Sequence, residues 1–406
     1  MSKSNASLQG LGVDAVSALG RVEQALASGA AYAAYVGLDV HRDTIAVSVA
    51  VCGRGEPEFV GEIAHKAKAV DKLVKRLSER FGGEALLFAY EAGPCGYGLY
   101  RQLVATGHAC EVVAPSLIPR KPGERVKTDR RDAQALARLM RAGELTAVWV
   151  PDEEQEAIRD LTRAREDMKA LELKARQRLG AFLLRHGRVY REGKNRWTQR
   201  HFRWLERQRF DNAVQQVTFE EYLEAVRHAQ RRVAALVQEM GRALESWSLR
   251  PVVEALMALR GVNLVTAMTI LAELGDITRF DSPRQLMAYL GVVPSEHSSG
   301  SRRHQGAITK AGNGHVRRLL IESAWAYRFP ARRTAVIQRR AEQAPPGVQA
   351  IAWEAQKRLH HRYRALMQAG KHKNVTLCAL ARELAGFLWA IACEHAGRPH
   401  GSRAVA

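Results

Sequence analysis

Residues 35–50 read YVGLDVHRDTIAVSVA, and this stretch decides the fold class of the N-terminal part of the chain. Val36, Leu38 and Val40 alternate with other residues, and the apolar residues at 45, 47 and 49 do the same. A period of two is the pattern of a β-strand, so the stretch predicts two strands. His41-Arg42-Asp43 is then the turn between them, and we interpret His41 as a turn residue.

Strand and helix patterns continue to alternate as far as residue 150. Apolar residues recur at helical spacing within 67–81, a short apolar run covers 85–90, and residues 97–106 and 110–114 predict another helix and another strand. Thr128 can cap a helix that ends near Ala142. The pattern predicts an α/β domain with a sheet core over residues 32–150. An Ala-, Ser- and Gly-rich leader with a short helix near 13–27 precedes it, at residues 1–31.

The remainder of the chain is predicted to be mainly helical. Residues 151–250 contain long amphipathic patterns and no proline between Pro151 and Pro251, which favours a helical or coiled-coil arm over a simple helical linker. Residues 251–335 predict a compact helical domain with a polar loop at 294–305, and residues 336–406 predict a basic helical tail. A chain of 406 residues has room for several such domains.

Charge is the strongest bulk signal. The chain has 62 Lys and Arg against 42 Asp and Glu, a net charge of +20, and residues 301–406 hold 19 against 5, a net +14. Such a field attracts polyanions, which predicts a nucleic-acid partner; the alternative is a basic protein with another role. A second basic cluster comprises Arg120, Lys121, Arg125, Lys127, Arg130 and Arg131.

Other features predict a cytoplasmic chain outside the membrane. The apolar stretch at 384–393 has about ten residues, half of what a bilayer span needs. Residues 1–30 lack the charged start and apolar centre of a signal peptide. Five cysteines without a CxxC pair argue against a disulfide framework and against a structural zinc site.

Four acidic residues are candidates for metal chemistry. Asp39 lies within an apolar strand, Glu91 ends another, and Asp129 and Asp132 stand three apart on one face of a helix start. Converging carboxylates repel one another unless cations neutralise them, and Mg²⁺ prefers oxygen ligands. Alone, each acid has an ordinary explanation, such as a turn, a helix cap, or an ion pair of Asp132 with a neighbouring arginine. Together they predict a metal-dependent nuclease site.

Three motifs carry a specific resemblance. The stretches GLDVH at 37–41, YEAGP at 90–94 and KTDRRDA at 127–133 resemble the DEDD transposases of the insertion sequence 110 and 1111 group. The resemblance implies a RuvC-like, RNase H-type domain in which Asp39, Glu91, Asp129 and Asp132 hold the metal.

The second half carries a matching resemblance. LRGV at 259–262, LGVVP at 290–294, SSG at 298–300 and GAITKAGN at 306–313 resemble the C-terminal transposase domain of that group. The family places a nucleophilic serine before the glycine, which implies Ser299. The residues alone would indicate only a solvated serine-rich loop. Basic residues that we expect to bind nucleic acid lie nearby: Arg302, Arg303, Lys310, Arg317 and Arg318.

The resemblance implies an enzyme that cuts and rejoins DNA strands with Mg²⁺. It also implies donor and target DNA as substrates, a structured noncoding guide RNA encoded by the element, and a homo-oligomer, a dimer or a tetramer. A RuvC-like nuclease or Holliday-junction resolvase is the alternative; it would use water and would not need Ser299. A catalytically inactive nucleic-acid-binding protein would need only the basic surface. We expect His297 and His304 to contact backbone phosphate.

Overall fold

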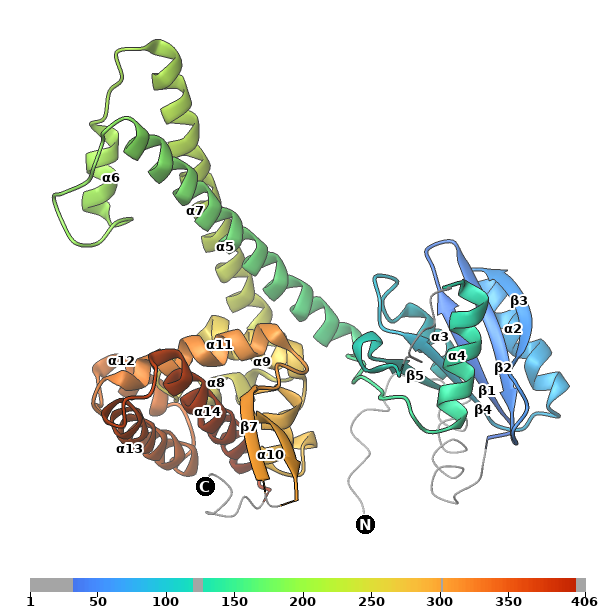
Figure 1. Ribbon diagram of the computed structural model, residues 1–406. Coiled ribbons are helices and arrows are strands. Elements are labelled where there is room, and N and C mark those ends of the chain that lie inside the picture. The colour runs from blue at the N-terminus through green and yellow to red at the C-terminus, as the bar shows by residue number, and fades with distance from the viewer. Residues whose placement is uncertain (1–31, 120–126, 301, 399–406) are drawn as a thin grey trace. The chain divides into compact units, whose positions relative to one another are not determined.

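The computed structural model describes residues 32–119, 127–300 and 302–398 (Figure 1). The chain divides into two compact units, residues 1–150 and residues 151–406. The predicted leader helix near 13–27 lies outside the described residues.

The core of the first unit is a five-stranded mixed sheet with the strand order β3-β2-β1-β4-β5. Strand β1 (Ala34–Val40) is antiparallel to β2 (Thr44–Val51), which is antiparallel to β3 (Glu58–Ala64). On its other side β1 is parallel to β4 (Leu86–Glu91), which is parallel to β5 (Ala109–Val113). The predicted pair of strands with a turn at 41–43 is confirmed. Sequence analysis missed β3, because none of its residues is buried and no clean apolar alternation marks it.

Helices complete this α/β unit. They are α2 (Ala67–Arg80), α3 (Gly98–Ala105) and α4 (Asp129–Arg141), with a 3-10 turn, η1 (Pro115–Leu117). The apolar face of α2 buries Val70, Leu73 and Leu77 in the core of the sheet. The hydroxyl of Thr128 accepts a hydrogen bond from the Arg131 N–H and caps α4, as predicted.

The second unit begins with a pair of long helices, α5 (Glu153–Arg185) and α7 (Ala213–Ser246), which pack against each other (Figure 1). This pair corresponds to the two amphipathic patterns of the predicted arm. A short helix, α6 (Gln199–Glu206), lies at the far end of the pair (Figure 1). Sequence analysis predicted no element there. A small core that includes Phe182, Leu205 and Phe219 joins α6 to both long helices.

The body of the second unit is helical. It consists of α8 (Arg250–Leu256), α9 (Leu264–Leu274), α10 (Pro283–Tyr289), α11 (Gly314–Ala324), α12 (Ala335–Ala341), α13 (Pro346–Gln368) and α14 (Lys373–His395), with 3-10 turns η2 (Ile277–Arg279) and η3 (Trp325–Arg328). Helix α14 packs against α8, α10, α11 and α13. Residues of the expected basic tail therefore share one hydrophobic core with residues of the expected transposase domain.

The apolar part of α14 is longer than the ten residues expected from the sequence. By length and composition this helix could cross a membrane, but 72% of its most apolar window is buried inside the unit. Burial of this kind is the pattern of a core helix, and the helix supplies much of the core.

The prediction of a polar loop at 294–305 is wrong. Residues there form an antiparallel hairpin of β6 (Pro294–Ser299) and β7 (Arg302–Ile308). The last four residues of β6 are exposed, so no buried apolar face marks the strand in the sequence. Ser299 pairs with Arg302 in the register and therefore stands at the end of the hairpin.

Candidate active site

Two neighbouring strands of the first unit deliver acidic side chains to the same edge of the sheet. Asp39 is the second-last residue of β1, and Glu91 is the last residue of β4. The two strands are parallel, and Leu38 lies opposite Tyr90. Asp39 and Glu91 follow this pair directly, so the register places them side by side in the sheet.

Gly37 lets helix α4 lie directly on β1. A Cβ atom at this position would stand 2.5 Å from the Ala137 nitrogen and closer still to the Ala133 oxygen, so no larger residue fits without moving the helix. The first turn of α4, immediately before Ala133, carries Asp129 and Asp132. The close approach of helix and strand therefore brings these two acids toward Asp39.

His41 lies between two of the acids. Its Nε2 atom is 3.3 Å from Asp39 Oδ2 and 3.4 Å from Asp129 Oδ1. The backbone confirms that it is a turn residue, because its N–H donates to the Thr44 carbonyl at 2.9 Å. Sequence analysis missed the position of the imidazole. The signal was available, because residues two apart in an extended strand point to the same face.

Burial and charge act together on Asp39. Its side chain is 15% exposed, and its buried Oδ2 atom makes no hydrogen bond to the residues that the structure describes. Burial raises the pKa of Asp39, His41 lowers it in part, and the carboxylates of Asp132, Asp129 and Glu91 raise it further. The four predicted acids are thus near enough to influence one another.

Three ligand groups converge most closely. One ligand atom each from Asp39, His41 and Asp129 lies within 4.8 Å of the others. Asp132 faces Lys127, with 3.6 Å between Nζ and Oδ2. A buried carboxylate oxygen without a hydrogen bond, facing a second carboxylate and an imidazole, fits a divalent cation. The predicted set of four acids did not include His41.

The hairpin of the second unit distinguishes its serines. Ser298 donates a hydrogen bond to Glu296 Oε1 at 2.8 Å. Ser299 is exposed, and its hydroxyl makes no hydrogen bond to any residue in the described ranges. Of this adjacent pair, Ser299 is therefore the one whose hydroxyl is available to an incoming group.

The predicted nucleic-acid-binding residues of this region have different surroundings. Arg302 and Lys310 are exposed. Arg317 donates to the carbonyls of Leu290 and Ala311 at 2.9 and 2.7 Å. Arg318 forms ion pairs with Glu166 and Glu322, both at 2.7 Å. The last two guanidinium groups are therefore occupied within the unit.

The basic residues beside the acids are exposed where they are described, namely Lys127, Arg130 and Arg131. The Arg130 guanidinium also lies over the Phe59 ring, 5.3 Å from its centroid. Arg120, Lys121 and Arg125 lie outside the described residues, as does the side chain of Arg303. Binding of nucleic acid by all these residues stays a prediction.

Comparison with known proteins defines the class as transposase. A family model described as Transposase, built on DEDD enzymes of the IS110 type, matches residues 36–187, and the model of the Transposase IS116/IS110/IS902 family matches residues 253–337. The putative transposase y4qE of Sinorhizobium fredii is 51% identical over 362 residues, 89% of either chain. The transposase for insertion sequence element IS1533 of Leptospira borgpetersenii is 33% identical over 83% of this chain and 97% of its own.

The chain belongs to the IS110 family of transposases, enzymes that cut and rejoin DNA. The resemblance drawn from the sequence motifs is confirmed. The transposase for insertion sequence element IS1111A of Coxiella burnetii is a more distant relative, 26% identical over 56% of this chain and 62% of its own.

Proposed function

We propose that this chain moves an insertion sequence by cutting donor and target DNA strands and rejoining them. The observation that carries the proposal is the Asp39 carboxylate, whose buried Oδ2 atom has no hydrogen bond within the described residues and which lies near three other acids. In this proposal residues 32–150 are a RuvC-like, RNase H-type domain. The strand order β3-β2-β1-β4-β5 and the placement of the acids on β1, β4 and α4 support that assignment.

The four acids Asp39, Glu91, Asp129 and Asp132 would hold Mg²⁺, with His41 beside them. Bound Mg²⁺ would favour deprotonation of a nucleophile and stabilise the leaving oxygen. The chain itself fixes the carboxylates, because Gly37 seats α4 on β1. Lys127, Arg130 and Arg131 would hold the phosphates of the strand beside the acids.

Ser299 would be the nucleophile. Its oxygen forms a bond to the scissile phosphorus and gives up its proton, the bond from phosphorus to one strand end breaks, and the leaving oxygen takes up a proton. The phosphoserine keeps the phosphodiester energy, so rejoining needs no ATP. The acids and Ser299 lie in different units, so the two units must meet during the reaction, within one chain or between copies of a dimer or tetramer.

A structured noncoding RNA encoded by the element would select the DNA by base pairing with donor and target. The protein would then read shape and backbone, which agrees with a net charge of +20 spread over several regions. Such an enzyme would act in the cytoplasm, at the nucleoid. RNA that copurifies with the protein, and that carries segments complementary to both DNA sites, would support this part of the proposal.

A denaturing gel tests the nucleophile. After incubation with labelled DNA and Mg²⁺, the wild-type protein should give a protein–DNA adduct, and Ser299→Ala should bind DNA yet give neither adduct nor recombinant product. Ser298→Ala is the matched control and should keep substantial activity. An adduct with Ser299→Ala but not with Ser298→Ala would show that Ser298, and not Ser299, is the nucleophile. Free 5′-phosphate product without any adduct in the wild type would indicate a RuvC-like nuclease or resolvase that uses water.

A further inference from the structure

The outer end of the helical arm is the most basic part of the molecule. This arm tip, residues 174–209, comprises the end of α5, the loop that follows it, α6 and the next three residues. It contains 12 Lys and Arg and only 2 acids, a net +10 in 36 residues. The net charge of this small region is therefore half as large as the net charge of the whole chain.

Almost none of this charge is neutralised within the protein. Both acids of the arm tip are already paired, Glu192 with Arg207 at 2.6 Å and Glu206 with Arg227 at 2.5 Å. Arg176 pairs with Glu172. In the described chain, ten exposed cations of the arm tip form no ion pair with an acid: Lys174, Arg178, Arg185, Arg188, Arg191, Lys194, Arg196, Arg200, Arg203 and Arg209. Such a concentration of like charge repels itself and favours a bound polyanion.

The cations stand on a folded platform rather than on a loose loop. Phe182, Leu205 and Phe219 form the buried core beneath them. The Trp197 backbone has a φ of +66, which is rare for a bulky residue, and its N–H donates to His201 Nδ1 at 3.1 Å. Arg188 lies over the Phe210 ring, 5.5 Å from its centroid. Groups held in place before binding lose less entropy when they bind.

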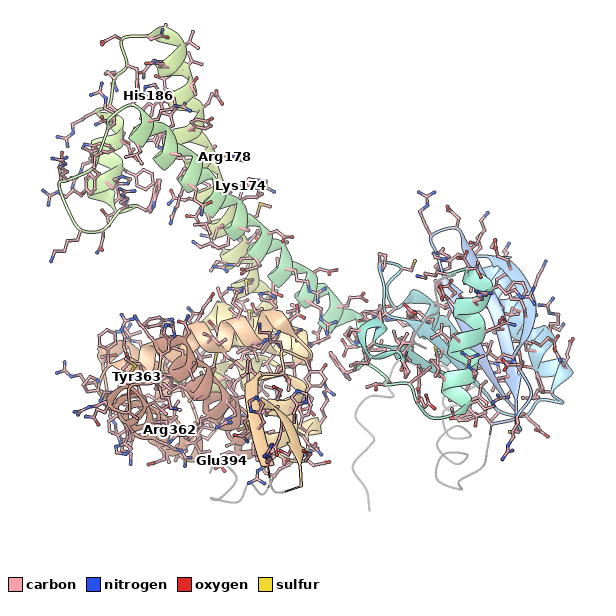
Figure 2. The ribbon with its side chains drawn as sticks, in the orientation of Figure 1. Lys174, Arg178, His186, Arg362, Tyr363 and Glu394 are labelled. Atoms are coloured by element: carbon pink, nitrogen blue, oxygen red, sulfur yellow. The ribbon has the colours of Figure 1, made fainter. Side chains whose placement is uncertain are left out.

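Figure 2 shows Lys174 and Arg178 along the outer part of α5 and His186 just beyond its end. A recess lined by Arg188, Tyr190, Arg196, Trp197 and Trp204, among others, opens beside α6 and has a volume of about 60 Å³. The exposed cations are distributed over the end of α5, the loop that follows it and α6, so a ligand that contacts many of them must extend beyond this recess. The ligand must lie across the surface, as the backbone of a polyanion does.

We infer that the arm tip binds the phosphate backbone of a nucleic acid, apart from the acid cluster and Ser299. The two matched family stretches end at residue 187 and begin again at 253, so the greater part of the arm tip, residues 188–209, lies between them. An anionic lipid surface is the competing ligand. It is disfavoured because Leu184 and Val189 are the only large apolar residues well exposed in the arm tip, which is too little for an apolar membrane face.

The test removes three free cations, Arg196→Ala, Arg200→Ala and Arg203→Ala, from the full-length protein. Binding to an RNA hairpin and to a DNA duplex of equal length is measured without divalent metal, so the result does not depend on the catalytic proposal. Each lost phosphate contact should reduce the slope of log K against log salt by about 0.7 to 0.9, so a total reduction of about 2 to 3 is expected. At about 0.2 M salt the affinity should fall roughly 10-fold to 100-fold.

Two controls separate a local effect from a loss of net charge. Replacing the same three arginines with lysine keeps the charge and should keep most of the slope. Lys68→Ala, Lys72→Ala and Arg76→Ala remove three exposed cations from α2 of the first unit and should change the slope little. Equal weakening by the arm-tip and α2 variants, with unchanged thermal unfolding, would overturn the inference.

The probes also identify the ligand. Loss confined to the RNA hairpin assigns the arm tip to RNA, and loss confined to the duplex assigns it to DNA; either result supports a phosphate-backbone site. Vesicles of phosphatidylglycerol in phosphatidylcholine serve as the third probe. If the arm-tip variant loses vesicle binding but keeps both nucleic-acid slopes, the surface binds lipid and the inference is wrong.

Discussion

Two carboxylates with a buried oxygen, Glu273 in the second unit and Asp39 in the first, have opposite surroundings. Glu273 on α9 has a side chain that is only 2% exposed, and Arg163 donates to both of its oxygens at 2.8 and 3.0 Å. Asn313 adds a hydrogen bond at 2.7 Å. Asp39 on β1 has His41 at 3.3 Å, no hydrogen bond to Oδ2 within the described chain, and three acids as neighbours.

The pKa values follow from these partners. Burial by itself raises the pKa of Glu273, but the His315 imidazole at 3.7 Å and the hydrogen bonds from Arg163 and Asn313 outweigh burial and hold that pKa far below its usual range. Burial raises the pKa of Asp39, and the neighbouring acids add to the rise. Glu273 thus joins α5, α9 and the turn before α11 into one structure, whereas Asp39 is left in need of a cation from outside.

Asp39→Asn should have the largest effect, and it should act on function alone. The change keeps the shape but removes one ligand charge, so DNA cleavage should fall by more than the ~10- to 100-fold that loss of an outer-shell partner costs. Stability without metal should not fall, because a buried charge among like charges disappears. Cleavage assays, Mn²⁺ titration and thermal unfolding measure these effects. Cleavage at the wild-type rate would remove Asp39 from the site.

Glu273→Gln should instead destabilise the second unit, by about 3 kcal/mol at neutral pH, because Arg163 and His315 lose a charged partner. The pKa of Glu273 is depressed in the folded state, so its contribution is present above the ordinary value of 4.5 and is lost as the pH falls below it. Urea unfolding at several pH values measures both effects. Glu322→Gln, at an exposed acid paired with Arg318, is the control and should cost less than about 1 kcal/mol.

Gly37→Ala tests whether close packing of α4 builds the acid cluster. The added methyl group overlaps the α4 backbone, so we expect a loss of about 1 to 3 kcal/mol together with weaker Mn²⁺ binding, because Asp129 and Asp132 move. Gly98→Ala is the matched control, since open space surrounds that position. Unchanged metal binding in Gly37→Ala would show that the acids do not depend on this contact.

His41→Gln should change the stability of the first unit only slightly. The imidazole is half exposed, and pairs of this kind contribute about 0 to 1 kcal/mol. Thermal unfolding without metal should therefore change little. A loss above about 2 kcal/mol would mean that His41 holds the two acids together in the way Arg163 holds Glu273, and the contrast between the two carboxylates would then be weaker.

The sequence contained the same local signal for both carboxylates, an acid within an apolar element. That signal predicts a functional role for Asp39 because a motif surrounds the residue. No such motif surrounds Glu273 in the run LVTAMTILAEL, and sequence analysis missed it. Local pattern did predict β1, β2, α4 and its Thr128 cap. It could not predict that Arg163 meets Glu273 from 110 residues away, because such a contact depends on tertiary packing.

Two other features were not predicted from the sequence, for different physical reasons. The hairpin β6–β7 has mostly exposed residues, so it lacks the buried face that produces a strand pattern. The charge of the arm tip has no motif around it, unlike the basic cluster at 120–131, and it lies within helices whose pattern indicates packing rather than binding. A count over residues 174–209 would have revealed it without a structure.

The length of the arm sets a distance. Helix α5 has 33 residues, which at 1.5 Å per residue extend about 50 Å from its start at Glu153 to its end at Arg185, within the arm tip. On duplex DNA, with a spacing of 3.4 Å, this corresponds to about 15 base pairs. The length of the arm can therefore fix the distance along the DNA between contacts of the body and contacts of the arm tip. Inserting matched helical turns into α5 and α7 should move the DNA segment that the arm tip protects by a known number of base pairs. A nuclease-protection footprint would measure this shift.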